Sequence, residues 1–179
     1  GTLEASNQMI LRSYPTAELD STTFKRPPGI KDNLQITIRS LVISSSLPEG
    51  YADNAYAFSR AAFDYMHAMI SYDRDAPDPP RSGPECLTAS TGDCDEQTSA
   101  YFSILRARGV PGWYAYGILG DPFFSDEGWE AHAWGYIQLP LSDSWCEERN
   151  IVLQTCFVEA QVDVVNNKWL LSTPTAYID

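Results

Sequence analysis

Basic residues are scarce in this sequence, and that shortage excludes two classes of partner. Among 179 residues there are 12 Lys and Arg against 24 Asp and Glu, which gives a formal net charge of −12. A chain of this charge is repelled by phosphate backbones and by anionic membrane surfaces, so we expect neither nucleic-acid nor membrane binding. No apolar run approaches the roughly 20 residues that a membrane-spanning helix needs.

Histidine and cysteine are also few, which argues against metal and redox chemistry. The chain has two histidines and four cysteines: His67, His132, Cys86, Cys94, Cys146 and Cys156. No two cysteines are spaced as C-x-x-C, the pattern typical of thioredoxin-like and zinc-ribbon sites. A zinc site would need both histidines together with well-placed thiolates. We therefore expect no metal and no other cofactor.

The remaining composition, 44% hydrophobic and 20% charged, is typical of a folded globular chain. The length suits one domain with an extension. Residues 1–50 are predicted to form an N-terminal extension with one strand, where Leu34, Ile36 and Ile38 alternate with polar residues. Residues 51–179 are predicted to form the main domain.

Two helices are predicted in the first half of that domain. Over residues 54–71, apolar side chains recur every three to four positions and leave His67 on the polar face, as a surface histidine. An Asp-, Pro- and Gly-rich loop is expected over residues 73–92. The second helix begins at Cys94, with Asp93 as N-cap and Glu96 completing a capping box, and it ends near residue 108.

The spacing along this second helix predicts which side of it is buried. Cys94, Thr98, Tyr101 and Leu105 share one face, which we expect to point inward. The opposite stripe is expected to face solvent, and its members are Asp95, Ser99, Ser103 and Arg106.

After this helix the hydrophobic period changes to two, which is typical of strands. Strands are predicted at 113–119, 131–139, 151–158, 161–165 and 168–171. Loops are expected at 120–130 and 140–150, and Asn166-Asn167 is expected to form a turn because Asn tolerates left-handed backbone. The predicted fold class is α+β, with helices followed by an antiparallel sheet.

Cys94 occupies a chemically favoured position at the first turn of a helix. The partial positive charge and free N–H groups there favour thiolate over thiol and can stabilise an oxyanion. His132 is the inward-facing candidate for its base. Asp163 is a carboxylate within an apolar strand, which is costly unless it is paired, and pairing with His132 would explain it. The predicted catalytic residues are therefore Cys94, His132 and Asp163.

Several phrases resemble the transglutaminase-like superfamily. Gly92-Asp93-Cys94 followed by YFSILRARGVP over residues 101–111 is similar to that family's G-x-C helix and its LLRAxGIPAR ending. Residues 131–134 resemble the family's HAW strand, 162–163 its VD pair, and 70–73 its I-x-Y-D. The resemblance spans about residues 54–175. It implies a papain-like core, with the cysteine at a helix N-terminus and the histidine and aspartate on neighbouring strands.

The sequence departs from the family pattern in two places. Asp163 lies 31 residues after His132, which is farther than is usual in the family, so residues 140–158 would be an insertion. The acidic residues within this insertion are alternative third members of the triad: Asp143, Glu147 and Glu148. Eukaryotic transglutaminases also carry an oxyanion-stabilising tryptophan upstream of the cysteine, whereas the first tryptophan here is Trp113. The backbone N–H of Cys94 is thus the one oxyanion donor that can be assigned.

Trp129 and Trp134 flank His132 and are predicted to contact substrate. The acidic and aromatic stretch 121–130 is either a rim that favours a cationic or lysine-bearing substrate or a solvated loop. One disulfide is expected, either Cys146–Cys156 or one of these two with Cys86, and this favours an exported protein.

The resemblance implies cysteine-dependent acyl transfer on a protein or peptide amide. The thioacyl intermediate would be resolved by water or by an amine. The alternative is a non-catalytic binding module with the same fold. The oligomeric state stays open.

Overall fold

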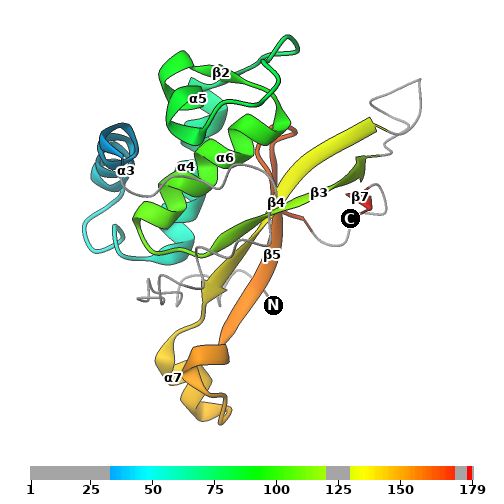
Figure 1. Cartoon of the computed structure of the whole chain (residues 1–179). Helices are drawn as coiled ribbons and strands as arrows, with labels where there is room; N and C mark the ends of the chain where they lie inside the picture. The colour runs from blue at the N-terminus through cyan, green and yellow to red at the C-terminus, as the bar shows by residue number, and fades with distance from the viewer. Residues whose placement is uncertain (1–32, 120–129, 172–176, 179) are drawn as a thin grey trace.

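The computed structural model describes residues 33–119, 130–171 and 177–178. Helices pack against a five-stranded antiparallel sheet with strand order β6-β5-β4-β3-β7, and a two-stranded parallel sheet, β1-β2, lies beside the helices (Figure 1). Mixed helices and strands in this arrangement confirm the predicted α+β class. The sheet positions the second half of the candidate site, and helix α6 positions the first.

Helix α6 (Cys94–Ala107) lies at the centre of the domain, between the sheet and helices α3, α4 and α5. Every residue from Asp95 to Arg106 is buried, so the solvent-facing stripe predicted for this helix is wrong. Small side chains explain how its polar side is covered. A Cβ atom on Gly83 of α5 (Gly83–Ala89) would lie only 2.9 Å from the backbone oxygen of Ser99.

Residues Leu34–Ser46 form a helix, α3, where a strand was predicted. Asn33 caps it by accepting a hydrogen bond from the Gln35 N–H at 2.8 Å. Ile36 and Ile43 are buried in the same core as α4 and α6, so this part of the predicted extension packs within the domain. The apolar alternation gave the wrong prediction because residues 36, 40 and 43, which are the buried residues of α3, also follow the spacing of a helix. Residues 1–32 lie outside the described residues.

Helix α4 (Ala55–Met69) confirms the predicted first helix and leaves His67 exposed. The segment expected to be a loop is more ordered than predicted. Strand β1 (Ser71–Tyr72) pairs in parallel with β2 (Thr91–Gly92), and α5 lies between these two strands in the sequence. The signal that was missed is S-x-x-E over residues 82–85, a capping box with proline inside the first turn.

The main sheet contains β3 (Gly112–Leu119), β4 (Glu130–Pro140), β5 (Phe157–Asp163), β6 (Lys168–Leu171) and β7 (Tyr177–Ile178). Strands β3, β4 and β6 confirm the strands predicted at 113–119, 131–139 and 168–171, whereas β7 was not predicted. The strands predicted at 151–158 and 161–165 are instead one strand, β5, which begins at Phe157 after a 3-10 turn, η1 (Leu153–Thr155), and ends at Asp163. The predicted loop 140–150 contains a short helix, α7 (Asp143–Glu148). The turn at Asn166-Asn167 is confirmed, with Asn167 at φ 53.

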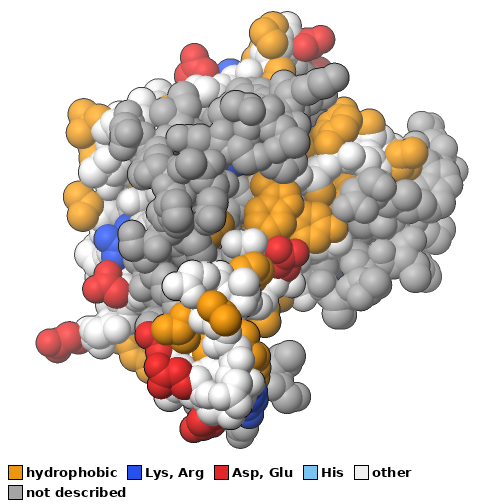
Figure 2. Space-filling view, turned by 60° about the horizontal axis from the view of Figure 1, so that its bottom comes forward, with side chains coloured by type: hydrophobic (Ala, Val, Ile, Leu, Met, Phe, Trp, Pro, Cys, Tyr) orange, Lys and Arg blue, Asp and Glu red, His pale blue; other side chains and the backbone are white. Residues whose placement is uncertain are grey.

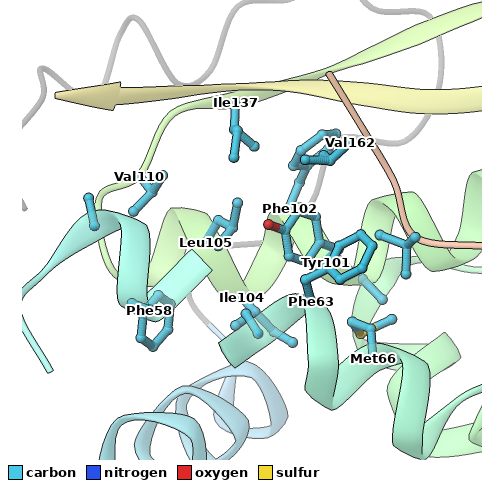
Figure 3. Packing of buried hydrophobic residues seen from close by; sticks show 14 of the residues in the cluster. Phe58, Phe63, Met66, Tyr101, Phe102, Ile104, Leu105, Val110, Ile137 and Val162 are labelled. Atoms are coloured by element: carbon cyan, nitrogen blue, oxygen red, sulfur yellow. The ribbon is translucent and has the colours of Figure 1, made fainter. Parts of the chain in front are cut away.

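The core lies between α6, α4 and one face of the sheet. Figure 3 shows Leu105 and Phe102 of α6 pointing toward Ile137 and Val162 of the sheet. Phe102 packs directly against the strand backbones, because glycine leaves room for its ring there. A Cβ on Gly112 would lie 2.6 Å from the Phe102 ring, and one on Gly135 would overlap it. This close packing fixes the height of α6 above β3 and β4.

Cys146 and Cys156 form a disulfide with a Cα–Cα distance of 6.1 Å. It ties α7 to the segment before β5 and selects one of the three predicted pairings. Cys86 and Cys94 are free, Cys86 being buried and Cys94 partly exposed.

Candidate active site

The site begins at the N-terminus of α6. Asp93 caps the helix by accepting a hydrogen bond from the Glu96 N–H at 3.2 Å, and Cys94 is the first helical residue. The Asp73 N–H donates to the Gly92 carbonyl at 3.0 Å, which extends the β1-β2 pairing and fixes the chain just before Cys94. The partly exposed thiol therefore lies at the positive end of the helix dipole.

Glu96 does not complete the predicted capping box. Its buried carboxylate accepts hydrogen bonds from the backbone N–H, Nε and Nη2 of Arg81 at 2.7, 2.9 and 2.8 Å. A fully buried carboxylate needs a charged partner more than it needs the N-cap N–H. Arg81 also contacts Asp73 at 3.3 Å, so this ion-pair network ties the segment before α5 to the start of α6.

His132 lies near the start of β4 and joins the other two predicted catalytic residues. Its Nε2 is 2.7 Å from Oδ2 of Asp163, and the Cys94 side chain lies close enough to raise the pKa of His132 by hydrogen bonding and charge. Because Asp163 engages Nε2, we assign the contact with sulfur to Nδ1. The structure thus brings together Cys94, His132 and Asp163, which are far apart in the sequence.

The charges around His132 favour its imidazolium form. Burial by itself lowers the pKa of His132, because it disfavours the charged ring. The hydrogen bonds and negative charges of Asp163 and Cys94 outweigh burial and raise the pKa of His132 from 6.5 to about 9. At neutral pH the site therefore holds a protonated imidazole between a carboxylate and a sulfur.

The alternative third residues lie elsewhere. Asp143, Glu147 and Glu148 are on α7, which follows the opposite end of β4 from His132. Eight residues of strand separate His132 from that end, which is roughly 25 Å of chain. Viewed from that end, the α7 region comes forward with its acidic side chains at the surface (Figure 2). Asp163 is completely buried and is the carboxylate that contacts His132.

Trp134 does not line a substrate surface as predicted. It is fully buried, and its ring stacks on His132 with centroids 5.9 Å apart and an interplanar angle of 18°. Alternate residues of a strand share a face, which places this ring beside the imidazole. Trp129 and the acidic stretch before Glu130 lie outside the described residues.

Two residues at the site were missed by the sequence analysis. Asn166 was treated only as a turn residue, yet its side-chain amide is 2.8 Å from Asp163 Oδ2. Its signal was the three-residue spacing from Asp163, which is typical of local side-chain hydrogen bonding in turns. Tyr72 of β1 is half exposed. The pKa of Tyr72 is raised, mainly by the burial of its other half and then by the negative charges of Cys94 and Asp93. Tyr72 is therefore near enough to Cys94 for the two side chains to interact through charge.

Within residues 33–119, 130–171 and 177–178, no group of three or more His, Cys, Asp or Glu is arranged to hold a metal ion. No helix in the same residues combines the length and apolarity needed to cross a bilayer.

Comparison with known proteins identifies a family. The profile of the transglutaminase-like superfamily matches residues 46–147, which is more than half of the chain. Among solved structures, the chain is similar to a candidate cysteine protease from Cytophaga hutchinsonii, with 17% identity and a TM-score of 0.47. The match covers 84% of this chain and 50% of that one, so this chain spans about half its length. Among curated proteins, none matches this chain significantly.

Proposed function

We propose, from the premise that this chain belongs to the transglutaminase-like superfamily, that it is a cysteine enzyme that transfers acyl groups from amide substrates. The observation that carries the proposal is the contact of His132 with both Cys94 and Asp163. A helix N-terminus, a partly exposed thiol and an imidazole raised in pKa are the parts that nucleophilic cysteine catalysis requires.

The first half of the reaction forms a thioester. The Cys94 thiolate attacks the carbonyl carbon of the amide, and the carbonyl electron pair moves to the oxygen. The backbone N–H of Cys94, at the start of α6, donates to this oxyanion. When the tetrahedral intermediate collapses, the C–N bond breaks and the His132 imidazolium gives its Nδ1 proton to the leaving amine.

The second half releases the acyl group. Neutral His132 removes a proton from the acceptor, whose oxygen or nitrogen attacks the thioester carbon, and the C–S bond breaks to restore the Cys94 thiolate. With water the product is a carboxylic acid, and with a primary amine it is a new amide. We favour water, because the partly exposed Cys94 lies where solvent reaches it. A protein or peptide supplies the amide.

The second candidate is a non-catalytic module that keeps the fold. Retention of the complete Cys94-His132-Asp163 contact argues against it, because a buried carboxylate would be a costly feature of a purely structural strand. The Cys146–Cys156 disulfide favours an oxidising compartment, and we propose export on that ground.

Thiol reactivity tests the proposal before any substrate is known. At pH 6.5 we expect iodoacetamide to label Cys94 faster than it labels glutathione, because the helix N-terminus and the protonated His132 both favour attack by its sulfur. Cys86 is an internal control: burial, with the negative charge of Glu96, raises its pKa to about 12, so it should not react in the folded protein. Peptide mapping by mass spectrometry separates the two sites.

Turnover is then measured with labelled casein. Peptide release reports hydrolysis, and incorporation of a fluorescent primary amine reports crosslinking. Cys94→Ala should abolish whichever activity is present, whereas Cys86→Ala should retain it. A Cys94 that reacts no faster than glutathione at pH 6.5 contradicts the catalytic proposal and favours the non-catalytic module.

A further inference from the structure

We propose that Asn166 is a positioning residue that locks the Asp163 carboxylate toward His132 and covers their hydrogen bond on the solvent side. The inference deepens the proposed function and rests on it for its catalytic consequence. Its physical content, the state of one proton on His132, can be measured without turnover.

One residue holds both oxygens of the carboxylate. The Asn166 backbone N–H donates to Asp163 Oδ1 at 3.1 Å, and the Asn166 side-chain amide donates to Asp163 Oδ2 at 2.8 Å. A carboxylate that is held at both oxygens cannot rotate about its terminal bond without losing one of these contacts. Oδ2, the oxygen 2.7 Å from His132 Nε2, is thereby kept in place.

The orientation of the Asn166 amide follows from the same contacts. Its Nδ2 lies 3.3 Å from His132 Nε2, and both nitrogens are close to Asp163 Oδ2. Both nitrogens carry protons when the imidazole is charged, so the shared oxygen accepts from each of them. With the amide flipped, the asparagine oxygen would face the carboxylate oxygen and repel it. The hydrogen-bond network therefore selects one amide orientation.

The burial of the three residues places Asn166 on the outside. Asp163 is completely buried and His132 is 6% exposed, whereas Asn166 is exposed. The Nε2–Oδ2 hydrogen bond thus has the Asn166 amide between it and solvent. Excluding water from a charged hydrogen bond strengthens it, because the local dielectric constant falls.

The hairpin between β5 and β6 delivers Asn166 to this place. Asp163 ends β5 and pairs with Lys168, which begins β6, so the turn between them brings the chain back over the carboxylate. Asn167 takes the left-handed conformation that closes the turn, at φ 53. These two neighbouring asparagines therefore have different tasks: Asn167 shapes the turn, and Asn166 contacts the site.

This difference supplies a matched pair of variants. Asn166→Ala removes the amide donor, whereas Asn167→Gly keeps the turn conformation and leaves the Asp163 contacts untouched. Asn166→Asp keeps the shape but replaces the donor with a carboxylate beside Nε2. A residue that only shapes the turn would change stability in these variants without changing the chemistry of His132.

Nitrogen-15 NMR of labelled histidine reads the proton on Nε2 directly. In Asn166→Ala we expect solvent exchange of this proton to accelerate at least about tenfold. We also expect kcat, or the Cys94 alkylation rate, to fall about tenfold while KM is unchanged. This is the size expected for the loss of one hydrogen bond to a charged group. The melting temperature should also fall, because a hydrogen bond to a buried carboxylate contributes to the stability of the fold. In Asn166→Asp the added charge should raise the titration midpoint of His132 above that of the unsubstituted protein.

Three results would overturn the proposal. One is unchanged proton exchange in Asn166→Ala, and another is an equal effect of Asn167→Gly, which would assign the effect to the turn. If Asn166→Ala does not fold, Asn166→Asp decides, and an unchanged His132 midpoint there overturns the proposal. A protein that shows the expected exchange and midpoint but turns over no substrate refutes the proposed function alone.

Discussion

Replacing Asp163 with asparagine is the sharpest perturbation of the candidate triad. Asp163→Asn keeps the side-chain shape and removes the charge that pairs with His132 at 2.7 Å. His132 then becomes a weaker base, and the Cys94 thiolate loses part of its counter-ion. We expect a folded protein with a large loss of turnover and of Cys94 alkylation near neutral pH.

The size of the loss follows from the pKa of His132. A rise from 6.5 to about 9 corresponds to roughly 3 kcal/mol in favour of the imidazolium. Burial opposes this rise, and Asp163 and Cys94 both produce it. If about half of the net effect belongs to Asp163, its removal costs roughly 1.7 kcal/mol, or about twentyfold in the population of the imidazolium form that pairs with Cys94. Serine triads lose about four orders of magnitude on the same change, and a thiol needs weaker activation than a hydroxyl.

Alkylation by iodoacetamide as a function of pH is the assay. We expect the loss in Asp163→Asn to be largest at pH 6 to 7 and to shrink above about pH 9, where a thiol ionises without a partner. The control is Asp143→Asn, on α7 at the far end of β4, which should leave the profile unchanged. A silent Asp163→Asn together with a damaging Asp143→Asn would refute the assignment of the third residue, and an equal loss at every pH would refute the ion-pair argument.

Two further predictions concern stability. The pKa of His132 is higher in the folded state than in the unfolded state, so its contribution to the free energy of unfolding is complete below pH 6.5 and is lost as pH rises toward about 9. In urea unfolding, the free energies of the unsubstituted protein and of His132→Gln should differ by up to roughly 3 kcal/mol at pH 6 and converge at pH 9.5. A difference that does not change with pH would contradict this. Gly135→Ala should destabilise the domain by about 1–3 kcal/mol in the same assay, because the new methyl group overlaps the Phe102 ring, and an unchanged unfolding midpoint would show that the ring is free to move.

Part of the site could be predicted from local sequence signals. An N-cap, a thiol in the first helical turn and a glycine-proline helix end are properties of short segments, so Cys94 was placed correctly at the start of a helix. Strand alternation put His132 and Asp163 on strands for the same reason. The family resemblance added the expectation that these strands are neighbours, and the β4-β5 pairing has this arrangement.

Local signals failed where a side chain had two competing partners. Glu96 has the spacing of a capping box, but the Arg81 side chain reaches it from the segment before α5 and provides a stronger charged contact. Ser99 and Ser103 look like a solvent face, but their small size allows α5 to pack there. In each case the deciding group is distant in the sequence.

The sequence by itself therefore determined the acidic character of the chain, helices α4 and α6, strands β3 to β6 of the main sheet, and the chemical types of the three site residues, because these depend on composition and on contacts within a few residues. Only the tertiary structure decided that Asp163 rather than an acidic residue of α7 meets His132, that Trp134 stacks behind the imidazole, and that Asn166 joins the site. Those outcomes depend on strand pairing and on the β5-β6 turn, which bring together side chains separated by up to 34 residues and set their distances to within hydrogen-bonding range.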